Sequence, residues 1–240
     1  SWGVVGQRFD ASGNAIGGEF TVNSTISGSQ YQSSVAGLGG GGFVVAWRDD
    51  SGTNDSGVGV KAQRYDASGN TLGAEFVVNS TILSSQYEPS VVGLAGGGFV
   101  VTWRDDATDG SSAGVFGQIY TAAGVTEGGE FQVNTNTVNS QYRPSVGALT
   151  DGGFVVTWRD DSGQDGSGEG VYAQRYDALG NTIGGEFRVN ENTSSSQFDP
   201  WIVGLDNGGF VIAWQDNSGR DSSGSGIFAQ QYDSAGDRID

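Results

Sequence analysis

Apolar residues recur along this chain in blocks that share one period. The block Gly98-Phe-Val-Val-Thr-Trp103 has close counterparts that end at Trp47, Trp158 and Trp214. The four tryptophans are 56, 55 and 56 residues apart. Because a fixed spacing of this length is the signature of a repeat architecture, we predict that the chain is built from copies of one unit.

Each unit is predicted to contain four strands. The first has small and apolar residues: Ser34–Leu38, Ser90–Leu94, Ser145–Leu149 and Trp201–Leu205. The second is the apolar block, whose β-branched run is typical of a strand covered on both faces. The third, rich in Gln and Tyr, has five copies: 4–10, 60–66, 115–121, 171–177 and 227–233. The fourth is short: Glu19–Asn23, Glu75–Asn79, Glu130–Asn134 and Glu186–Asn190.

The residues between these blocks have turn chemistry. A Gly-Gly pair precedes the apolar block in every unit, which suits a tight hairpin turn. Asp-Ala-Ser-Gly-Asn or a close relative follows the third strand, with Asp to open a turn and Gly to take positive φ. The three prolines, Pro89, Pro144 and Pro200, stand just before the first strand, where the N–H that they lack is not needed. No segment has a helical period, so an all-β fold is predicted.

Repeated four-stranded antiparallel units favour a β-propeller of about four blades, with a linear β-solenoid of stacked units as the alternative. We expect one domain over 1–240, with units at about 30–85, 86–140, 141–196 and 197–240 and a partial unit at 1–29. In a closed ring the N-terminal fourth strand could complete the last blade. The surplus third strand would then either compete for the same place or pair with another molecule.

Composition narrows the chemistry. The net charge is −17, and an acidic chain repels nucleic acid and anionic membranes. The chain has no Cys, Met or His, which excludes disulfides, thiolate metal sites and a histidine base. No apolar run approaches the roughly 20 residues of a membrane-spanning helix.

The loop after each periodic tryptophan is rich in Asp, Ser and Gly. Calcium takes six to eight oxygen ligands, often carboxylates on glycine-rich loops, so calcium is a candidate cofactor here. The alternative is that these residues only form Asx-type turns. The candidate ligands are Asp49, Asp50, Asp55, Asp105, Asp106, Asp109, Asp160, Asp161, Asp165, Asp216 and Asp221.

Aromatic residues offer a second kind of site. An aromatic ring stacks on the apolar face of a sugar while Asn, Gln and Asp bind its hydroxyls. The candidates are Tyr31, Tyr87, Tyr142 and Phe198, which follow a repeated Gln, and Trp201, which replaces the Ser of the other units. The alternative is that the rings pack between blades. The repeated Gln residues are expected to bond to the backbone of a neighbouring blade.

No catalytic constellation is evident. An active site needs one asymmetric arrangement, and the Asp residues recur almost unchanged in every unit. The chain is therefore predicted not to be an enzyme.

The repeat resembles one found in very large secreted bacterial proteins of the RTX and adhesin type. The resemblance is carried by Gln-Tyr-Xaa-Pro-Ser-Val, by Gly-Gly-Phe-Val-Val-Thr-Trp and by Gly-Gly-Glu-Phe-Xaa-Val-Asn, and it covers essentially the whole chain. It implies a secreted or cell-surface location with abundant calcium. The calcium-binding nonapeptides that accompany such repeats are not part of this sequence, so their sites are not carried over.

Together these observations predict an extracellular, non-enzymatic binding or adhesion module. It would bind carbohydrate or a cell-surface polymer at several equivalent sites, with calcium stabilising the acidic loops. The alternative is a structural subunit of a filament or surface layer, assembled by strand exchange.

Overall fold

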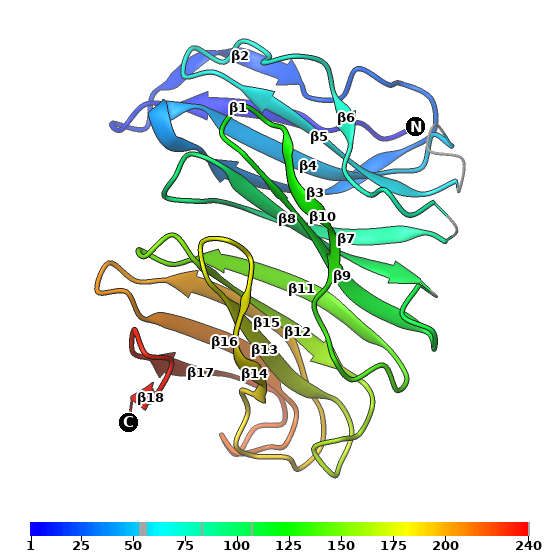
Figure 1. Ribbon diagram of the computed structural model, residues 1–240, viewed down its shortest axis with the longest axis vertical. Coiled ribbons are helices and arrows are strands. Elements are labelled where there is room, and N and C mark those ends of the chain that lie inside the picture. The colour runs from blue at the N-terminus through cyan, green and yellow to red at the C-terminus, as the bar shows by residue number, and fades with distance from the viewer. Residues whose placement is uncertain (53–56, 83, 107, 240) are drawn as a thin grey trace.

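The computed structural model describes residues 1–52, 57–82, 84–106 and 108–239, and they fold into antiparallel sheets (Figure 1). The chain opens with a two-stranded sheet of β1 (Val5–Phe9) and β2 (Ala15–Thr21). Sheet B has β3 (Gln30–Gly37), β4 (Phe43–Asp49), β5 (Gly59–Tyr65) and β6 (Phe76–Val77). Sheet C has β7 (Gln86–Gly93), β8 (Phe99–Asp106), β9 (Ala113–Tyr120) and β10 (Thr126–Gln132).

The second half of the chain repeats the pattern. Sheet D has β11 (Gln141–Ala148), β12 (Phe154–Asp160), β13 (Gly170–Tyr176) and β14 (Thr182–Arg188). Sheet E has β15 (Gln197–Gly204), β16 (Phe210–Asp216), β17 (Gly226–Tyr232) and β18 (Arg238–Ile239). A 3₁₀ turn at Gly39–Gly41 is the one helical element in the described residues, and none of their helices is long and apolar enough to cross a membrane.

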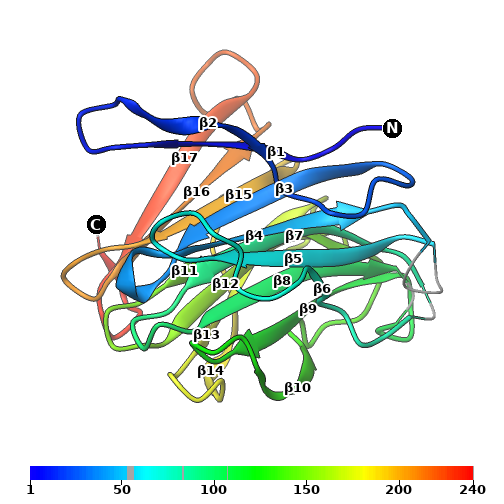
Figure 2. The same ribbon diagram turned by 90° about the horizontal axis from the view of Figure 1, so that it is seen from above.

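The sheets are arranged as the blades of a β-propeller. Each four-stranded sheet is ordered as its strands occur in the chain, and β3, β7, β11 and β15 lie side by side as the inner strands. Figures 1 and 2 show the blades fanning out around this inner edge. The propeller prediction is therefore confirmed, and the linear solenoid was wrong.

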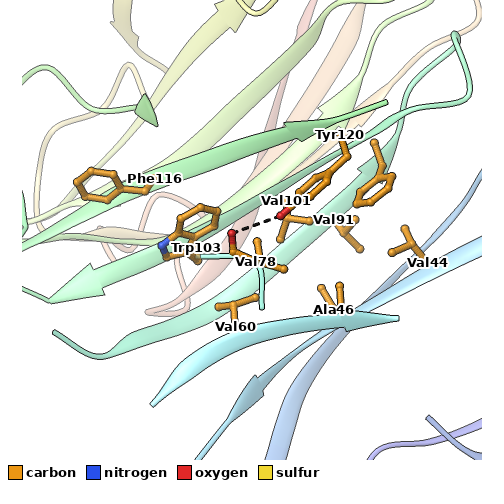
Figure 3. Close-up of a cluster of buried hydrophobic side chains, with 11 residues drawn as sticks. Val44, Ala46, Val60, Val78, Val91, Val101, Trp103, Phe116 and Tyr120 are labelled. Carbon is orange, nitrogen blue, oxygen red and sulfur yellow. Dashed lines mark hydrogen bonds between the residues drawn. The ribbon is translucent and has the colours of Figure 1, made fainter. Parts of the chain in front are cut away.

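The hydrophobic core lies between successive blades. Between sheets B and C, Val44, Ala46 and Val60 pack against Val101 and Trp103 (Figure 3). The strands β8 and β12 are thus covered on both faces, as their unbroken Phe-Val-Val pattern predicts, whereas Val211 and Ala213 of β16 stay partly exposed. Trp47, Trp103 and Trp158 are fully buried and Trp214 nearly so, which makes the periodic tryptophans core residues.

The inner strands begin four residues earlier than the sequence indicated. Pro89, Pro144 and Pro200 were expected before the strand, but they lie inside it, where the register between the first and second strands shifts. Such a shift is a β-bulge, which tolerates proline because ladder hydrogen bonds are interrupted there. Beyond the bulge the strands approach closely: a Cβ on Gly93 would meet the Gly37 carbonyl oxygen at 2.0 Å.

The N-terminal hairpin occupies a blade position of its own. The prediction that its fourth strand completes the last blade was wrong, because β18 pairs with β17 and β2 pairs with β1. The Arg8 guanidinium donates to the Ala67 and Ser68 carbonyls of sheet B. Arg64 makes the same contacts with the matching turn of sheet C. The hairpin therefore packs against sheet B in the way that sheet B packs against sheet C. We call its place the fifth blade position.

The mid-strand glutamines have a different partner from the one predicted. Gln63 Nε2 donates to the carbonyls of Arg64 and Gly73 in its own sheet, and Gln174 bonds in the same way to Arg175 and Gly184. The register of the third and fourth strands shifts at this point, which leaves carbonyls without ladder partners. These amides therefore satisfy a bulge within one blade.

Candidate functional site

The four inner strands surround a pocket of about 570 Å³ at the centre of the blades. We call it the central pocket. It is lined by Gln32–Val35, Glu88–Ser90, Arg143–Ser145 and Asp199–Trp201. Each inner strand therefore contributes the same short segment, which is the segment that contains its β-bulge.

One position in that segment differs in every blade. Gln32, Glu88, Arg143 and Asp199 follow the repeated Gln-Tyr or Gln-Phe pair, and all four have positive φ between 51° and 57°. Positive φ is uncommon for residues other than glycine and costs of the order of 1 kcal/mol or more at each position. The bulge holds these four side chains at the pocket wall, and the strain is repeated at four polar positions.

Charged groups meet across the central pocket. Arg143 Nε lies 3.5 Å from Glu88 Oε1 and 3.4 Å from Asp199 Oδ1. The Arg143 backbone N–H also donates to Glu88 Oε2 at 2.8 Å, which fixes the Glu88 carboxylate. Because both oxygens contact one nitrogen, they are at most about 7 Å apart, the two contacts being 3.5 Å and 3.4 Å. A separation up to that limit allows either the roughly 5 to 5.5 Å between the paired carboxyl groups of retaining glycoside hydrolases or the short end of the roughly 6.5 to 9.5 Å of inverting ones.

Trp201 provides an aromatic surface at the same pocket. Its side chain is 72% exposed, although it lies on an inner strand. The equivalent Ser34, Ser90 and Ser145 accept hydrogen bonds from the backbone N–H of the next inner strand. An exposed indole beside polar groups is suited to stacking on a sugar ring. Of the five predicted aromatic residues, Trp201 is the one that the structure brings to the central pocket.

The other four aromatic residues lie between blades and contact arginines. The Arg48 guanidinium is 4.4 Å from both the Tyr31 and Tyr87 ring centroids. Arg159 lies in the same way over Tyr142 and Phe198, at 4.7 Å and 5.3 Å. These cation–π contacts link successive blades. The placement matches the packing alternative for these four residues.

The first Asp of each acidic loop is buried in a polar network. Asp49 accepts from Gln30 Nε2 at 3.1 Å, and Asp105 accepts from Gln86 Nε2 at 2.8 Å. Asp160 has the same partner type in Gln141, and burial raises the pKa of its carboxyl. Asp216 accepts from the Ser218 N–H at 2.8 Å. These carboxylates therefore have protein donors.

The remaining acidic residues of these loops form ion pairs, are exposed or close short turns. Asp50 and Asp106 pair with Arg48 and Arg104 at 2.8 Å and 2.6 Å, and Asp161 is exposed. Asp109, Asp165 and Asp221 each accept a backbone N–H two residues later. Asp55 lies outside the described residues. Within the described ranges no group of three or more carboxylates lies close enough together to hold a metal ion, and calcium stays a prediction.

Sequence reasoning did not identify Gln32, Glu88, Arg143 and Asp199. The available signal was their variation, since this one position changes charge from unit to unit while Tyr or Phe precedes it and Ser or Pro follows it. An asymmetric site on a symmetric ring has to arise at such a position. Their convergence depends on the propeller geometry, because the residues are more than fifty positions apart in the chain.

No family model and no curated protein matches this chain. It is similar in structure to a protein of unknown function from Dyadobacter fermentans, with a TM-score of 0.60, 10% identity and coverage of 88% of this chain and 67% of the other. It is also similar to an α-L-arabinanase of Penicillium chrysogenum complexed with arabinobiose, with a TM-score of 0.59 and 14% identity. A third similar structure is an α-L-arabinofuranosidase of Fusarium graminearum with arabinobiose, with a TM-score of 0.61 and 10% identity.

The chain covers 62% of the length of each of the two glycosidases, which in turn cover 85% of this chain. At these identities the likeness shows a shared propeller-like fold. It corrects the sequence-based interpretation of a non-enzymatic binding or adhesion module and its filament alternative. The fold is one that glycoside hydrolases use, and the sequence argument against an enzyme assumed that no repeat position was asymmetric. The central pocket contains such a position.

Proposed function

We propose that this protein processes carbohydrate and that the central pocket hydrolyses a glycosidic bond. The observation that supports the proposal most directly is the meeting of Glu88, Arg143 and Asp199 beside the exposed Trp201. A pair of carboxyl groups is the usual catalytic equipment of glycoside hydrolases. The likeness to an α-L-arabinanase and an α-L-arabinofuranosidase, each complexed with arabinobiose, gives the fold a precedent for such chemistry.

In the proposed reaction, Trp201 stacks on one sugar ring and places the glycosidic bond between the two carboxyl groups. One carboxyl donates its proton to the leaving oxygen as the bond from the anomeric carbon breaks. Either the other carboxylate takes a proton from the attacking water, or it bonds to the anomeric carbon until water replaces it. Arg143, with a side chain 53% exposed, contacts both carboxylates and sets their separation.

The test is hydrolysis of arabinan oligosaccharides and of aryl glycosides of several sugars, because two similar proteins hold arabinobiose. Glu88→Gln and Asp199→Asn should each lower kcat by about 10²- to 10⁴-fold. Asp206→Asn is the matched control, since Asp206 is exposed in a turn of sheet E. Equal turnover by Glu88→Gln, Asp199→Asn and the parent protein would contradict the proposal.

The resemblance to repeats of large secreted bacterial proteins supports the further proposal that this activity is extracellular. Calcium binding by the acidic loops belongs to the same proposal and would stabilise the fold outside the cell. Self-association stays a prediction as well. None of the three is needed for chemistry at the central pocket.

A further inference from the structure

The strand β1 has a free edge at the fifth blade position. Its partner among the described residues is β2, whereas the equivalent β5, β9, β13 and β17 pair on both edges. The Val22 N–H donates to the Val4 carbonyl, so Val4 faces β2. Because backbone groups alternate in direction along a strand, Val5, Gln7 and Phe9 present their N–H and C=O groups to the free edge. A strand edge of this kind is a template for pairing.

Side chains on both sides of this position are uncovered. On sheet B, Val35 is 66% exposed, whereas its equivalents Val91 and Val146 are 6% exposed. On sheet E, Ile227 is 74% exposed, whereas its equivalent Val171 is fully buried. Between two four-stranded sheets, the equivalent residues are covered by the first and second strands of the adjacent blade. The exposed apolar residues of sheets B and E therefore both face the fifth blade position.

The space for these strands is present beside the hairpin. A cavity of about 280 Å³ lies between β1–β2 and sheet B, and its walls include Val5, Phe20, Val35 and Val45. At the interface of sheets D and E, the buried cluster includes Leu149, which directly follows β11, and Val155 of β12, so the ends of the first and second strands of sheet D fill the corresponding region.

A glycine gives independent support. Gly93 and Gly204 lie where inner strands nearly touch, and an added Cβ would meet the carbonyl oxygen of the preceding blade at 2.0 Å and 1.9 Å. Gly37 occupies the same repeat position on sheet B, yet a Cβ there meets nothing within 4 Å. The blade that would crowd Gly37 is the one at the fifth position.

From these four observations we propose that the fifth blade position binds a β-hairpin with the sequence pattern of this repeat's own first and second strands. Its second strand pairs with β1 in the register that β12 takes on β13. The Phe of Gly-Gly-Phe-Val-Val-Thr-Trp then lies opposite Phe9, and the Trp opposite Val5. Its first strand becomes a fifth inner strand between β15 and β3.

A single extended strand is a poorer fit than a hairpin. Pairing with β1 alone would cover the edge but leave the inner residues Val35 and Val203, the latter 57% exposed, in water. A hairpin reaches the inner strands through its second arm and so covers both faces. The proposal rests on packing and hydrogen bonding and does not depend on the activity of the central pocket.

The experiment adds a synthetic peptide with the sequence of residues 141–160 to the full chain. We expect binding at least about tenfold tighter than that of a control peptide with Asp at the positions of Val155 and Trp158. The peptide should also raise the unfolding temperature and slow hydrogen exchange at the amides of Val5, Gln7 and Phe9. Equal binding of the two peptides would overturn the proposal.

Two variants of the protein make the test specific. Gly37→Ala and Ile227→Asp alter exposed positions, so they should leave the unfolding temperature of the free protein unchanged. Each should weaken peptide binding at least about tenfold, because one blocks the inner strand and the other charges the buried face. Unaltered binding to both variants would refute the site. If light scattering shows a dimer, and the β1 amides are protected from hydrogen exchange without added peptide, the hairpin proposal is overturned and the site binds a second copy of the chain.

Discussion

Replacing Glu75 by Gln should destabilise the contact between sheet B and the segment that directly follows β2. The Glu75 carboxylate accepts hydrogen bonds from the Ser24 N–H at 2.7 Å and from Thr25 Oγ1. It also contacts Lys61 Nζ at 3.0 Å, and this lysine is buried and bound to Asp49 as well. Burial alone would raise the pKa of Glu75, but hydrogen bonds from Thr25, Ser24 and Lys61 outweigh it and lower the pKa to about 2.

The lowered pKa of Glu75 sets the size of the expected loss in unfolding free energy. A pKa moved from about 4.3 in the unfolded chain to about 2 corresponds to roughly 3 kcal/mol of stability. The side chain is 10% exposed, so solvent screens the interaction only weakly. Since the amide of Gln keeps some of the hydrogen bonds, we expect Glu75→Gln to cost about 2 kcal/mol at neutral pH.

The pH dependence has a definite sign. A lowered pKa in the folded state gives stability that is complete above the unfolded pKa and is lost as the pH falls towards the folded one. The difference in unfolding free energy between the parent and Glu75→Gln should therefore shrink between about pH 5 and pH 2. Urea unfolding at about pH 7, 5, 4 and 3 measures it.

Glu130→Gln is the matched control. Glu130 accepts from the Ser80 N–H at 2.8 Å and from Thr81 Oγ1 at 2.7 Å, as Glu75 does from Ser24 and Thr25. Phe116 occupies the position of Lys61, so the control keeps the hydrogen bonds without the buried ammonium group. We expect a loss of about 1 kcal/mol. The reasoning is refuted if both variants cost the same, or if the Glu75→Gln loss does not change with pH.

Three further predictions follow from single positions. Gly93→Ala should lower the unfolding free energy measured by thermal unfolding by about 1–3 kcal/mol, because its Cβ would meet a carbonyl oxygen. Gly37→Ala should change that free energy by less than about 0.5 kcal/mol. Equal effects of the two variants would contradict the inner-strand geometry. Trp201→Ala should raise the KM for a cleaved glycan about tenfold. Because the ring is exposed, the melting curve measured by circular dichroism should not change. An unchanged KM would show that Trp201 is not part of the proposed site. Calcium should raise the unfolding temperature and a chelator should lower it. The stabilisation should increase with the logarithm of the ratio of the free calcium concentration to the dissociation constant. A melting curve that neither calcium nor a chelator changes would contradict calcium binding.

Local patterns were sufficient for the second and third strands of each unit, whereas the first and fourth strands begin about four residues earlier than predicted, except for β6. The apolar blocks that end at the periodic tryptophans lie in β4, β8, β12 and β16, and the glycine of each Asp-Ala-Ser-Gly-Asn turn has positive φ as predicted. These features depend on residues adjacent in the chain, whose conformational preferences act over short distances. The prolines were misplaced because a β-bulge depends on the pairing partner as well as on local propensity.

The candidate site could not be predicted in this way. The sequence directed attention to the acidic loops, where repeated Asp residues are conspicuous, but the structure engages Asp49, Asp105 and Asp160 in hydrogen bonds with glutamines. Glu88 and Asp199 are single acidic residues with no pattern around them except the repeat itself. They become candidate site residues only because the fold brings both carboxylates into contact with Arg143.

By itself, the sequence determined a repeated four-stranded unit, because strand period, turn residues and buried tryptophans are properties of contiguous segments. Only the tertiary structure decided that the units close around a centre, that the bulges of four inner strands bring unlike charges into one pocket, and that the fifth position holds two strands with an open edge. The physical reason is that the energy of blade-to-blade packing and of opposed charges depends on distances in space, and the repeat spacing leaves those distances undefined until the blades have packed.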